Sequence, residues 1–163
     1  MTVHPIPPVC GEDAEILILG SFPSVKSREQ GFFYGHPQNR FWKMLAAVLD
    51  EPLPQTVTEK KAMLIRNRIA LWDVIASCEI TGSSDASIRD VTPNDIRALL
   101  ERAKIRRILC NGNTAFRLYR KYILPQTGRE ALRLPSTSPA NAACGPEALT
   151  DAWKNAIQKE REI

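Results

Sequence analysis

The chain has 163 residues, 44% of them hydrophobic and 25% charged, which is the balance of a globular protein with enough apolar material for one core. Its longest apolar run is far shorter than the roughly 20 residues that cross a bilayer, and its N-terminus lacks the basic and apolar parts of a signal peptide. The sequence therefore predicts one domain over residues 1–163, soluble and cytoplasmic, with no membrane contact. The net charge of +4 is compatible with a polyanionic partner but does not single one out.

In chain order, the first expected element is a strand over residues 15–20, an unbroken apolar run that ends at a glycine, as strands buried on both faces do. The expected elements after it are a loop (21–38), helices (40–49 and 58–67), a strand (69–75), a polar loop (77–90), a helix (92–103), a strand (105–110), a helix (113–122), a strand (131–134), a loop (135–144) and a final helix (146–159).

Three of these helices carry recognisable signals. Thr58 is the expected N-cap of the second helix, and Thr92-Pro93 reads as an N-cap followed by a proline in the first turn. The final helix is amphipathic and is expected to bury Leu149, Trp153 and Ile157.

Strands that alternate with helices predict right-handed crossovers and a parallel sheet covered on both faces. The expected fold is α/β, with three layers (α/β/α) around a central four-stranded parallel sheet. Ligand sites in such sheets lie at the carboxyl ends of the strands. The loops to search for function are therefore 20–39, 73–90, 111–113 and 135–144.

The four cysteines are dispersed, and no two of them form a CxxC pair. This spacing argues against a zinc ribbon and against an iron–sulfur cluster. Reduced thiols packed as small apolar side chains are expected instead, with no metal and no cofactor. The four positions are Cys10, Cys78, Cys110 and Cys144.

The first of the candidate loops joins small polar residues to aromatic ones. Gly20-Ser-Phe-Pro-Ser24 follows a strand directly, so its backbone can approach a phosphate or a base closely. Three adjacent aromatic residues then offer stacking surfaces, although packing on the core is an equal alternative for Phe32 and Phe33. His36 is interpreted as a structural hydrogen-bonding residue without a catalytic role.

The last loop offers three hydroxyls, on Ser136, Thr137 and Ser138, which suit phosphate oxygens, although a capped turn has the same composition. Neither GxGxxG nor GxxxxGK[ST] occurs, so the phosphate cradle of nucleotide-binding α/β domains is missing.

Four sequence blocks occur in order, each after a predicted strand: GSFPS (20–24), YGHPQNRFWKML (34–45), CNG (110–112) and LPSTSPAN (134–141). This set resembles the uracil-DNA glycosylase superfamily. It is most similar to the hypoxanthine (deoxyinosine) DNA glycosylase family and more distantly to the mismatch-specific uracil/thymine-DNA glycosylases, which carry GINPG, HPxNRFW, FNG and PSxxS blocks. The resemblance implies base excision repair of double-stranded DNA that contains a deaminated base, by a monomer associated with the nucleoid.

The resemblance implies a role for Asn39 in particular. The mismatch-specific enzymes have a catalytic asparagine in GINPG where this sequence has Phe22, so the group that holds the attacking water must come from elsewhere. The hypoxanthine family uses the asparagine of its HPQNRFW block, which is Asn39 here. A carboxamide can position water but cannot act as a general base. The alternative from the residues alone is an N-cap for the 40–49 helix.

The other roles implied by the resemblance fall on the same four loops. Tyr34 stacks on the flipped base, the backbone of Ser21 and Phe22 shapes the pocket, and Asn111 or Asn113 reads the polar edge of the base. Ser136 and Ser138 clamp flanking phosphates, and Asn141 or Ala140 fills the gap in the duplex. A turn around Gly112 is the alternative for the two asparagines.

Neither main loop block holds a carboxylate, which predicts slow to moderate turnover without a metal. Asp73 and Asp85, in the second loop, are interpreted as surface or capping residues. Two alternative functions stay open: excision of uracil or mismatched bases, and a nucleic-acid-binding relative without catalysis.

Overall fold

The computed structural model describes residues 1–158. Its central sheet has four parallel strands in the order β3-β2-β6-β7. The strands are β2 (Ile16–Gly20), β3 (Ile69–Asp73), β6 (Arg107–Asn111) and β7 (Leu132–Leu134). Each of the four predicted strands is present, and their ends differ from the prediction by at most two residues.

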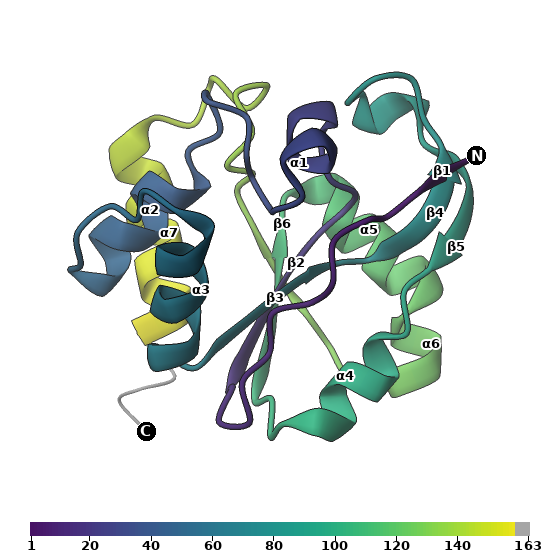
Figure 1. Ribbon diagram of the computed structural model, residues 1–163. Helices are drawn as coiled ribbons and strands as arrows, with labels where there is room; N and C mark the ends of the chain where they lie inside the picture. The colour runs from purple at the N-terminus through teal and green to yellow at the C-terminus, as the bar shows by residue number, and fades with distance from the viewer. Residues whose placement is uncertain (159–163) are drawn as a thin grey trace.

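The helices within the described residues are α1 (Val25–Gln30), α2 (Phe41–Leu49), α3 (Val57–Arg66), α4 (Ile96–Arg102), α5 (Asn113–Tyr122), α6 (Leu124–Thr127) and α7 (Pro146–Gln158). In Figure 1, α2, α3 and α7 cover one face of the sheet, and α4, α5 and α6 lie on the other side. The helix α7 buries Leu149, Trp153 and Ile157 as predicted, while its predicted last residue, Lys159, lies outside the described residues.

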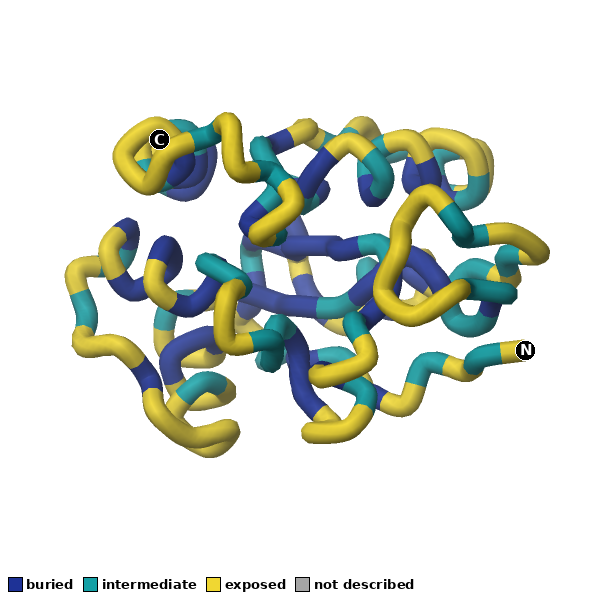
Figure 2. Tube along the Cα trace, turned by 90° about the horizontal axis from the view of Figure 1, so that it is seen from above, coloured by how far each residue is buried: buried dark blue, intermediate teal, exposed yellow. Residues whose placement is uncertain are grey.

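The central strand β2 shows why two helical layers are needed. All five of its residues are buried, and successive side chains point to opposite faces of the sheet. Ile16 and Ile18 pack into the core with α2, α3 and α7, whereas Leu17 and Leu19 pack into the core with α4 and α5. Figure 2 shows these buried strands between two layers that are exposed on their outer sides. The predicted three-layer α/β/α architecture is confirmed.

Two predicted helix starts are wrong. The cap of α3 is Thr56 and not Thr58, because Thr56 Oγ1 accepts from the Glu59 N–H (3.1 Å) while the Glu59 carboxylate accepts from the Thr56 N–H (2.9 Å). This reciprocal pair is a capping box. Two short helices were not predicted: α1, within the loop 21–38, and α6.

The second wrong start concerns Thr92-Pro93, which lies in a strand and not at a helix N-terminus. The helix α4 begins three residues later, where Asp95 Oδ1 accepts from the Ala98 N–H at 3.1 Å. Pro93 is tolerated because this strand lies at the edge of its sheet, where a missing N–H costs little.

A second, antiparallel sheet holds β1 (Thr2–Val3), β4 (Ile75–Glu79) and β5 (Arg89–Pro93) in the order β1-β4-β5. The predicted strand 69–75 therefore splits at Val74, whose N–H donates to the Gly20 carbonyl (2.8 Å) as the chain leaves the parallel sheet. The predicted loop 77–90 is wrong at both ends, which belong to β4 and β5, and it contains the 3-10 helix η1 (Asp85–Ser87). The sequence did not predict β4 and β5, because many of their residues are polar and half-exposed or exposed and form no unbroken apolar run.

The carboxyl ends of the parallel strands share one edge of the sheet, at the top of Figure 1. Gly20 and Asp73 are direct neighbours across β2 and β3 at this edge. Among the described residues, no helix is both long and apolar enough to cross a membrane.

Candidate active site

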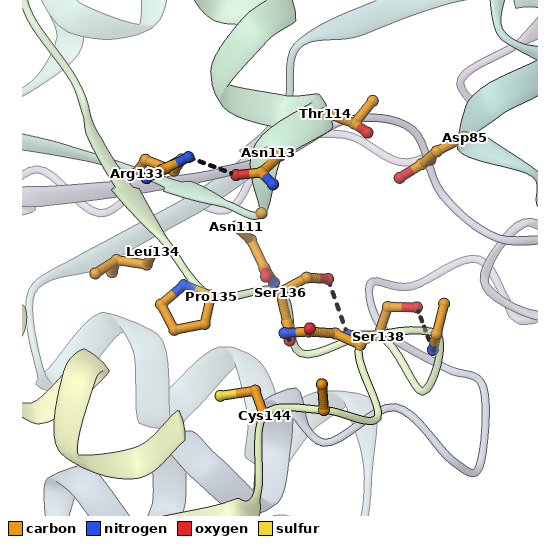
Figure 3. A pocket seen from close by; sticks show the side chains of 14 residues that line it. Asp85, Asn111, Asn113, Thr114, Arg133, Leu134, Pro135, Ser136, Ser138 and Cys144 are labelled. Carbon is orange, nitrogen blue, oxygen red and sulfur yellow. Dashed lines mark hydrogen bonds between the residues drawn. The ribbon is translucent and has the colours of Figure 1, made fainter. Parts of the chain in front are cut away.

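A cavity of about 340 Å³ opens at this edge of the sheet. That volume lies at the small end of the ~300–1,000 Å³ typical of ligand sites. Its walls include eight of the ten residues proposed from the sequence: Ser21, Phe22, Tyr34, Asn39, Asn111, Ser136, Ser138 and Ala140. The remaining two, Asn113 and Asn141, line a neighbouring and more open cavity of about 720 Å³, which is shown in Figure 3.

Gly20 forms part of the floor of the smaller cavity because no side chain fits there. A Cβ atom at this position would lie 2.4 Å from Asp73 Oδ1 and 2.9 Å from the Tyr34 hydroxyl. Both contacts are shorter than real Cβ atoms allow. The glycine that ends β2 thus leaves room at the floor for the Asp73 carboxylate and for the Tyr34 hydroxyl, which is buried without a hydrogen-bond partner in the described part of the chain.

Tyr34 is held as a rigid wall of the cavity. Its ring stacks on Phe41, with centroids 4.2 Å apart and ring planes 22° apart. Its backbone is left-handed (φ 54°), a conformation that is costly for a side chain of this size and that clusters at functional sites. Burial raises the pKa of the Tyr34 phenol far above its usual range, and the nearby Asp73 carboxylate raises it further, so the hydroxyl keeps its proton.

Asp73 pairs with His4, a residue that the sequence did not suggest. His4 Nε2 lies 2.7 Å from Asp73 Oδ2, and the two side chains are 3% and 4% exposed. His4 Nδ1 accepts from the Ile6 N–H (3.1 Å), so Nε2 carries the ring proton and donates it to Asp73. The predicted surface position of Asp73 is therefore wrong: the carboxylate is buried and lines the cavity.

Asn39 belongs to a hydrogen-bonded chain whose direction two backbone N–H groups determine. The Thr137 N–H donates to Asn111 Oδ1 (3.0 Å), which leaves Asn111 Nδ2 to donate to Thr137 Oγ1 (3.0 Å). Thr137 Oγ1 then donates to Asn39 Oδ1 (2.9 Å), and the same oxygen accepts from the Phe41 N–H (2.9 Å). Thr137 is fully buried within this chain.

Two consequences follow for the Asn39 carboxamide. Its oxygen already accepts two hydrogen bonds, the capacity of a carbonyl, while Nδ2 has no partner among residues 1–158. The group therefore presents a donor, and not an acceptor, to whatever enters the cavity. The capping interpretation also has support, since Asn39 bonds the first residue of α2 while Arg40, at the N-cap, makes no side-chain cap bond.

The loop 135–144 is folded on itself. Ser136 Oγ accepts from the Ser138 N–H (3.1 Å), and Ser138 Oγ accepts from the Ala140 N–H (3.2 Å); both bonds are drawn in Figure 3. The hydroxyl protons of both serines remain available to an outside acceptor. Asn141 Nδ2 donates to the Ser136 carbonyl (3.1 Å), so its side chain is tied back, whereas Ala140 is exposed at the tip.

Hydrogen bonds from the Arg40 side chain join this loop to the start of α2. Its guanidinium donates to the carbonyls of Ser138, Asn141 and Cys144, and its Nε is buried without a partner in the described part of the chain. Together with the Thr137–Asn39 hydrogen bond, these bonds join the blocks HPQNRFW and STSPAN, which lie about 100 residues apart in the sequence.

The remaining candidates have local partners. Asn113 Oδ1 accepts from Arg133 (3.0 Å), as Figure 3 shows. His36 Nδ1 accepts from the Gln38 N–H (3.1 Å), in agreement with its structural interpretation. Phe32 and Phe33 are buried in the core, which decides between their two interpretations.

Asp85 stands at the rim shared by both cavities. Desolvation raises the pKa of its carboxyl although the residue as a whole is exposed, and the hydrogen bond from Ser21 Oγ (3.1 Å) partly offsets this effect.

Comparisons with known proteins identify the family to which this chain belongs. Residues 7–160 match the family model of the uracil DNA glycosylase superfamily. Two similar proteins are hypoxanthine DNA glycosylases, one from Methanosarcina acetivorans (39% identical, covering 83% of this chain and 85% of the relative) and one from Methanosarcina barkeri (37% identical, covering 94% and 96%). A solution structure of a candidate uracil DNA glycosylase from Methanosarcina acetivorans superposes with a TM-score of 0.81 at 35% identity, covering 94% of this chain and 95% of that one.

Proposed function

Because this chain belongs to the uracil DNA glycosylase superfamily, we propose that it is a hypoxanthine DNA glycosylase that acts on double-stranded DNA in base excision repair. The observation that carries the proposal is the cavity itself, which combines the rigid Tyr34 wall with the unpartnered Asn39 N–H group. The substrate is a flipped deoxyinosine nucleotide, since an N-glycosidic bond inside the duplex is out of reach.

The reaction is hydrolysis of one C1′–N9 bond. Cleavage develops positive charge on the sugar and negative charge on the departing base, and a water oxygen then bonds to C1′. The base leaves with one proton of that water, and the sugar keeps a hydroxyl. The enzyme's task is to hold the sugar, meet the charge of the base and place one water.

In this proposal Asn39 places the water. Its Nδ2 donates to the water oxygen, which fixes the water's position without taking its proton. This division of labour is supported by the two hydrogen bonds that Oδ1 already accepts. Water attack on a cationic sugar needs little further activation, but the carboxamide takes no proton from the water, so we expect slow to moderate turnover.

The other proposed roles divide between the base and the DNA backbone. Tyr34 stacks on the flipped base, an interaction worth ~1–3 kcal/mol, and the backbone of Ser21 and Phe22 shapes the pocket around it. Asn111, which lines the base cavity, is preferred over Asn113 as a base contact. Ser136 and Ser138 donate to phosphates. Of the two candidates for the duplex gap, Ala140 at the exposed tip is preferred over the tied-back Asn141.

Excision of uracil is the second candidate, because the structural relative is described as a candidate uracil DNA glycosylase. Uracil and hypoxanthine share a ring N–H beside a carbonyl, so one cavity can accept both.

The test is cleavage of labelled duplexes that contain deoxyinosine, deoxyuridine or neither, followed by alkali. Wild type is compared with Asn39→Ala and with the control Asn155→Ala, on the exposed face of α7. The proposal expects wild type and the control to cut deoxyinosine strands and Asn39→Ala to leave them intact. Binding without any cleavage would favour a non-catalytic DNA-binding protein, and a preference for deoxyuridine would favour the second candidate.

A further inference from the structure

The floor of the cavity holds a carboxylate oxygen that nothing in the described chain uses. Asp73 Oδ2 accepts from His4, whereas Oδ1 accepts no hydrogen bond from residues 1–158. The Asp73 side chain is only 4% exposed, yet it lines the cavity. Oδ1 is not among the fully enclosed polar atoms without a partner, so it is open to the cavity and can accept a hydrogen bond from a group that enters there.

His4 determines which oxygen faces the ligand. Its ring is fixed by the Ile6 N–H on Nδ1 and by edge or tilted contacts with Phe22, Phe33 and Trp72, whose centroids lie 5.9, 6.1 and 6.5 Å away. Its one N–H is directed at Oδ2, so that oxygen is turned away from the ligand. The cavity therefore meets Oδ1 alone, a group that accepts and cannot donate.

The Tyr34 hydroxyl shows where this oxygen stands relative to a stacked base. The hydroxyl and Asp73 Oδ1 both lie within 2.9 Å of the point where a Gly20 Cβ would be. The Tyr34 ring thus points its oxygen at the floor, where Asp73 lies. The hydroxyl itself is fully buried, so a base stacked on the open part of the ring has its polar edge directed at the floor of the cavity, where Oδ1 lies.

We propose that Asp73 reads the substrate base through Oδ1, which accepts the ring N–H of a lactam, and that His4 is the positioning residue of this carboxylate. The proposal rests on the proposed glycosylase function and names its selectivity. Hypoxanthine N1 and uracil N3 carry a proton, whereas adenine N1 and cytosine N3 carry a lone pair that would face Oδ1. The site then distinguishes deaminated bases from their parents at the atom whose protonation deamination changes.

His4 contributes to this selectivity in a second way. A lactam presents its N–H beside a carbonyl, and a free carboxylate would set its second oxygen against that carbonyl. Because His4 holds Oδ2 away, the lactam carbonyl meets no second acceptor from Asp73. Selectivity therefore depends on the His4 N–H and not on Asp73 alone.

The first test compares deoxyinosine with deoxynebularine, the purine nucleoside that lacks O6 and carries a lone pair on N1. Single-turnover cleavage is measured for wild type and Asp73→Asn, whose amide can turn an N–H toward N1. Loss of a hydrogen bond to a charged group is expected to reduce the deoxyinosine-to-nebularine rate ratio about 10- to 100-fold. An equal loss on both substrates, or no loss, overturns the inference while the proposed function stands. If wild type cleaves neither deoxyinosine nor deoxyuridine, both fail.

The second test separates the positioning role of His4 from a purely structural one. His4→Gln keeps an N–H that can reach Asp73, and His4→Phe keeps an aromatic ring but has no donor. The deoxyinosine-to-nebularine rate ratio is expected to stay near the wild-type value in His4→Gln. In His4→Phe it is expected to fall at least about fivefold, which is a smaller fall than that expected for Asp73→Asn. Thermal denaturation identifies variants that are folded. Folded His4→Phe with a wild-type ratio would contradict the role of His4.

Discussion

The two polar atoms of the Asn39 carboxamide have different surroundings. Oδ1 accepts from Phe41 and Thr137, whereas Nδ2 has no partner within residues 1–158. An aspartate keeps an oxygen for both donors, and its charge suits the N-terminus of α2, but it offers no N–H to water. We predict that Asn39→Asp stays within about 1 kcal/mol of the wild-type free energy of unfolding and cleaves deoxyinosine roughly 100-fold more slowly. Urea denaturation and single-turnover cleavage measure the two quantities.

Asn39→Ala completes this comparison. It removes both atoms, so it should lose similar activity and, in addition, about 1–2 kcal/mol of stability, because two donors lose their acceptor. Wild-type cleavage rates in Asn39→Asp would show that the Nδ2 donor does not hold the water.

The Asp85 carboxyl at the rim has a raised pKa, chiefly because of burial. Such a group stabilises the folded state fully at pH values below its ordinary pKa of 3.8, and the contribution is lost as the pH rises through the folded-state pKa. Asp85→Asn, which stays neutral, should therefore melt at a higher temperature than wild type at neutral pH. The difference should vanish in acid, below the ordinary pKa.

Thermal scans across this pH range check the prediction for Asp85. Asp151→Asn, on the exposed side of α7, makes the same charge change away from the cavities and serves as the control. A stabilisation of Asp85→Asn that persists unchanged in acid would show that ionisation of Asp85 is not its cause.

At the residue scale, the sequence predicted the site best where a motif carried the residue. Tyr34, Asn39, Asn111 and both loop serines line one cavity, as their blocks indicated. His4 could not be predicted, because it meets its partner across 69 residues and only through the pairing of β1 with β4.

At the scale of elements, apolar runs predicted β2, β3 and β6, since burial on both faces leaves an unbroken apolar signature, whereas β7 was predicted although two of its three residues are exposed. The same signal failed for β4 and β5, whose half-exposed residues read as a loop. Helix starts failed where two capping residues compete within a few positions, as Thr56 competes with Thr58. Local propensity alone cannot choose between them, because the packing of the apolar face decides the start.

The capping box of α3 gives a prediction with a matched control. Thr56→Ala leaves the Glu59 N–H without its acceptor and should lower the free energy of unfolding by about 1 kcal/mol. Thr58→Ala, two residues on and exposed, should change it by less than about 0.5 kcal/mol. Urea denaturation measures both variants, and neither should alter deoxyinosine cleavage because α3 does not line the cavity. Equal losses of unfolding free energy in the two variants would show that Thr56 is not the N-cap that stabilises α3.

At the scale of the whole molecule, the parallel sheet explains why the site could be located before its chemistry was known. Strands that run the same way bring their following loops to one edge, so four distant blocks converge there. The direction of each hydrogen bond could not be predicted, since it depends on the backbone N–H groups of Phe41 and Thr137. The convergence of the loops follows from the sheet topology, whereas the donor and acceptor roles in the hydrogen bonds around Asn39 follow from tertiary contacts.

The net charge of +4 leads to a prediction about salt. Each phosphate that the protein neutralises releases condensed counterions, so log K for an undamaged duplex should fall linearly with log salt concentration, with a slope of about −3 to −5 for a small footprint. Stacking on Tyr34 and the hydrogen bond to Asp73 release no counterions. The preference for a deoxyinosine duplex over an undamaged one should therefore stay constant as salt rises, although both affinities fall. Fluorescence anisotropy with Asn39→Ala, which is expected to bind without cutting, measures both slopes. A preference that disappears with salt would mean that phosphate contacts, and not the cavity, recognise the damaged base.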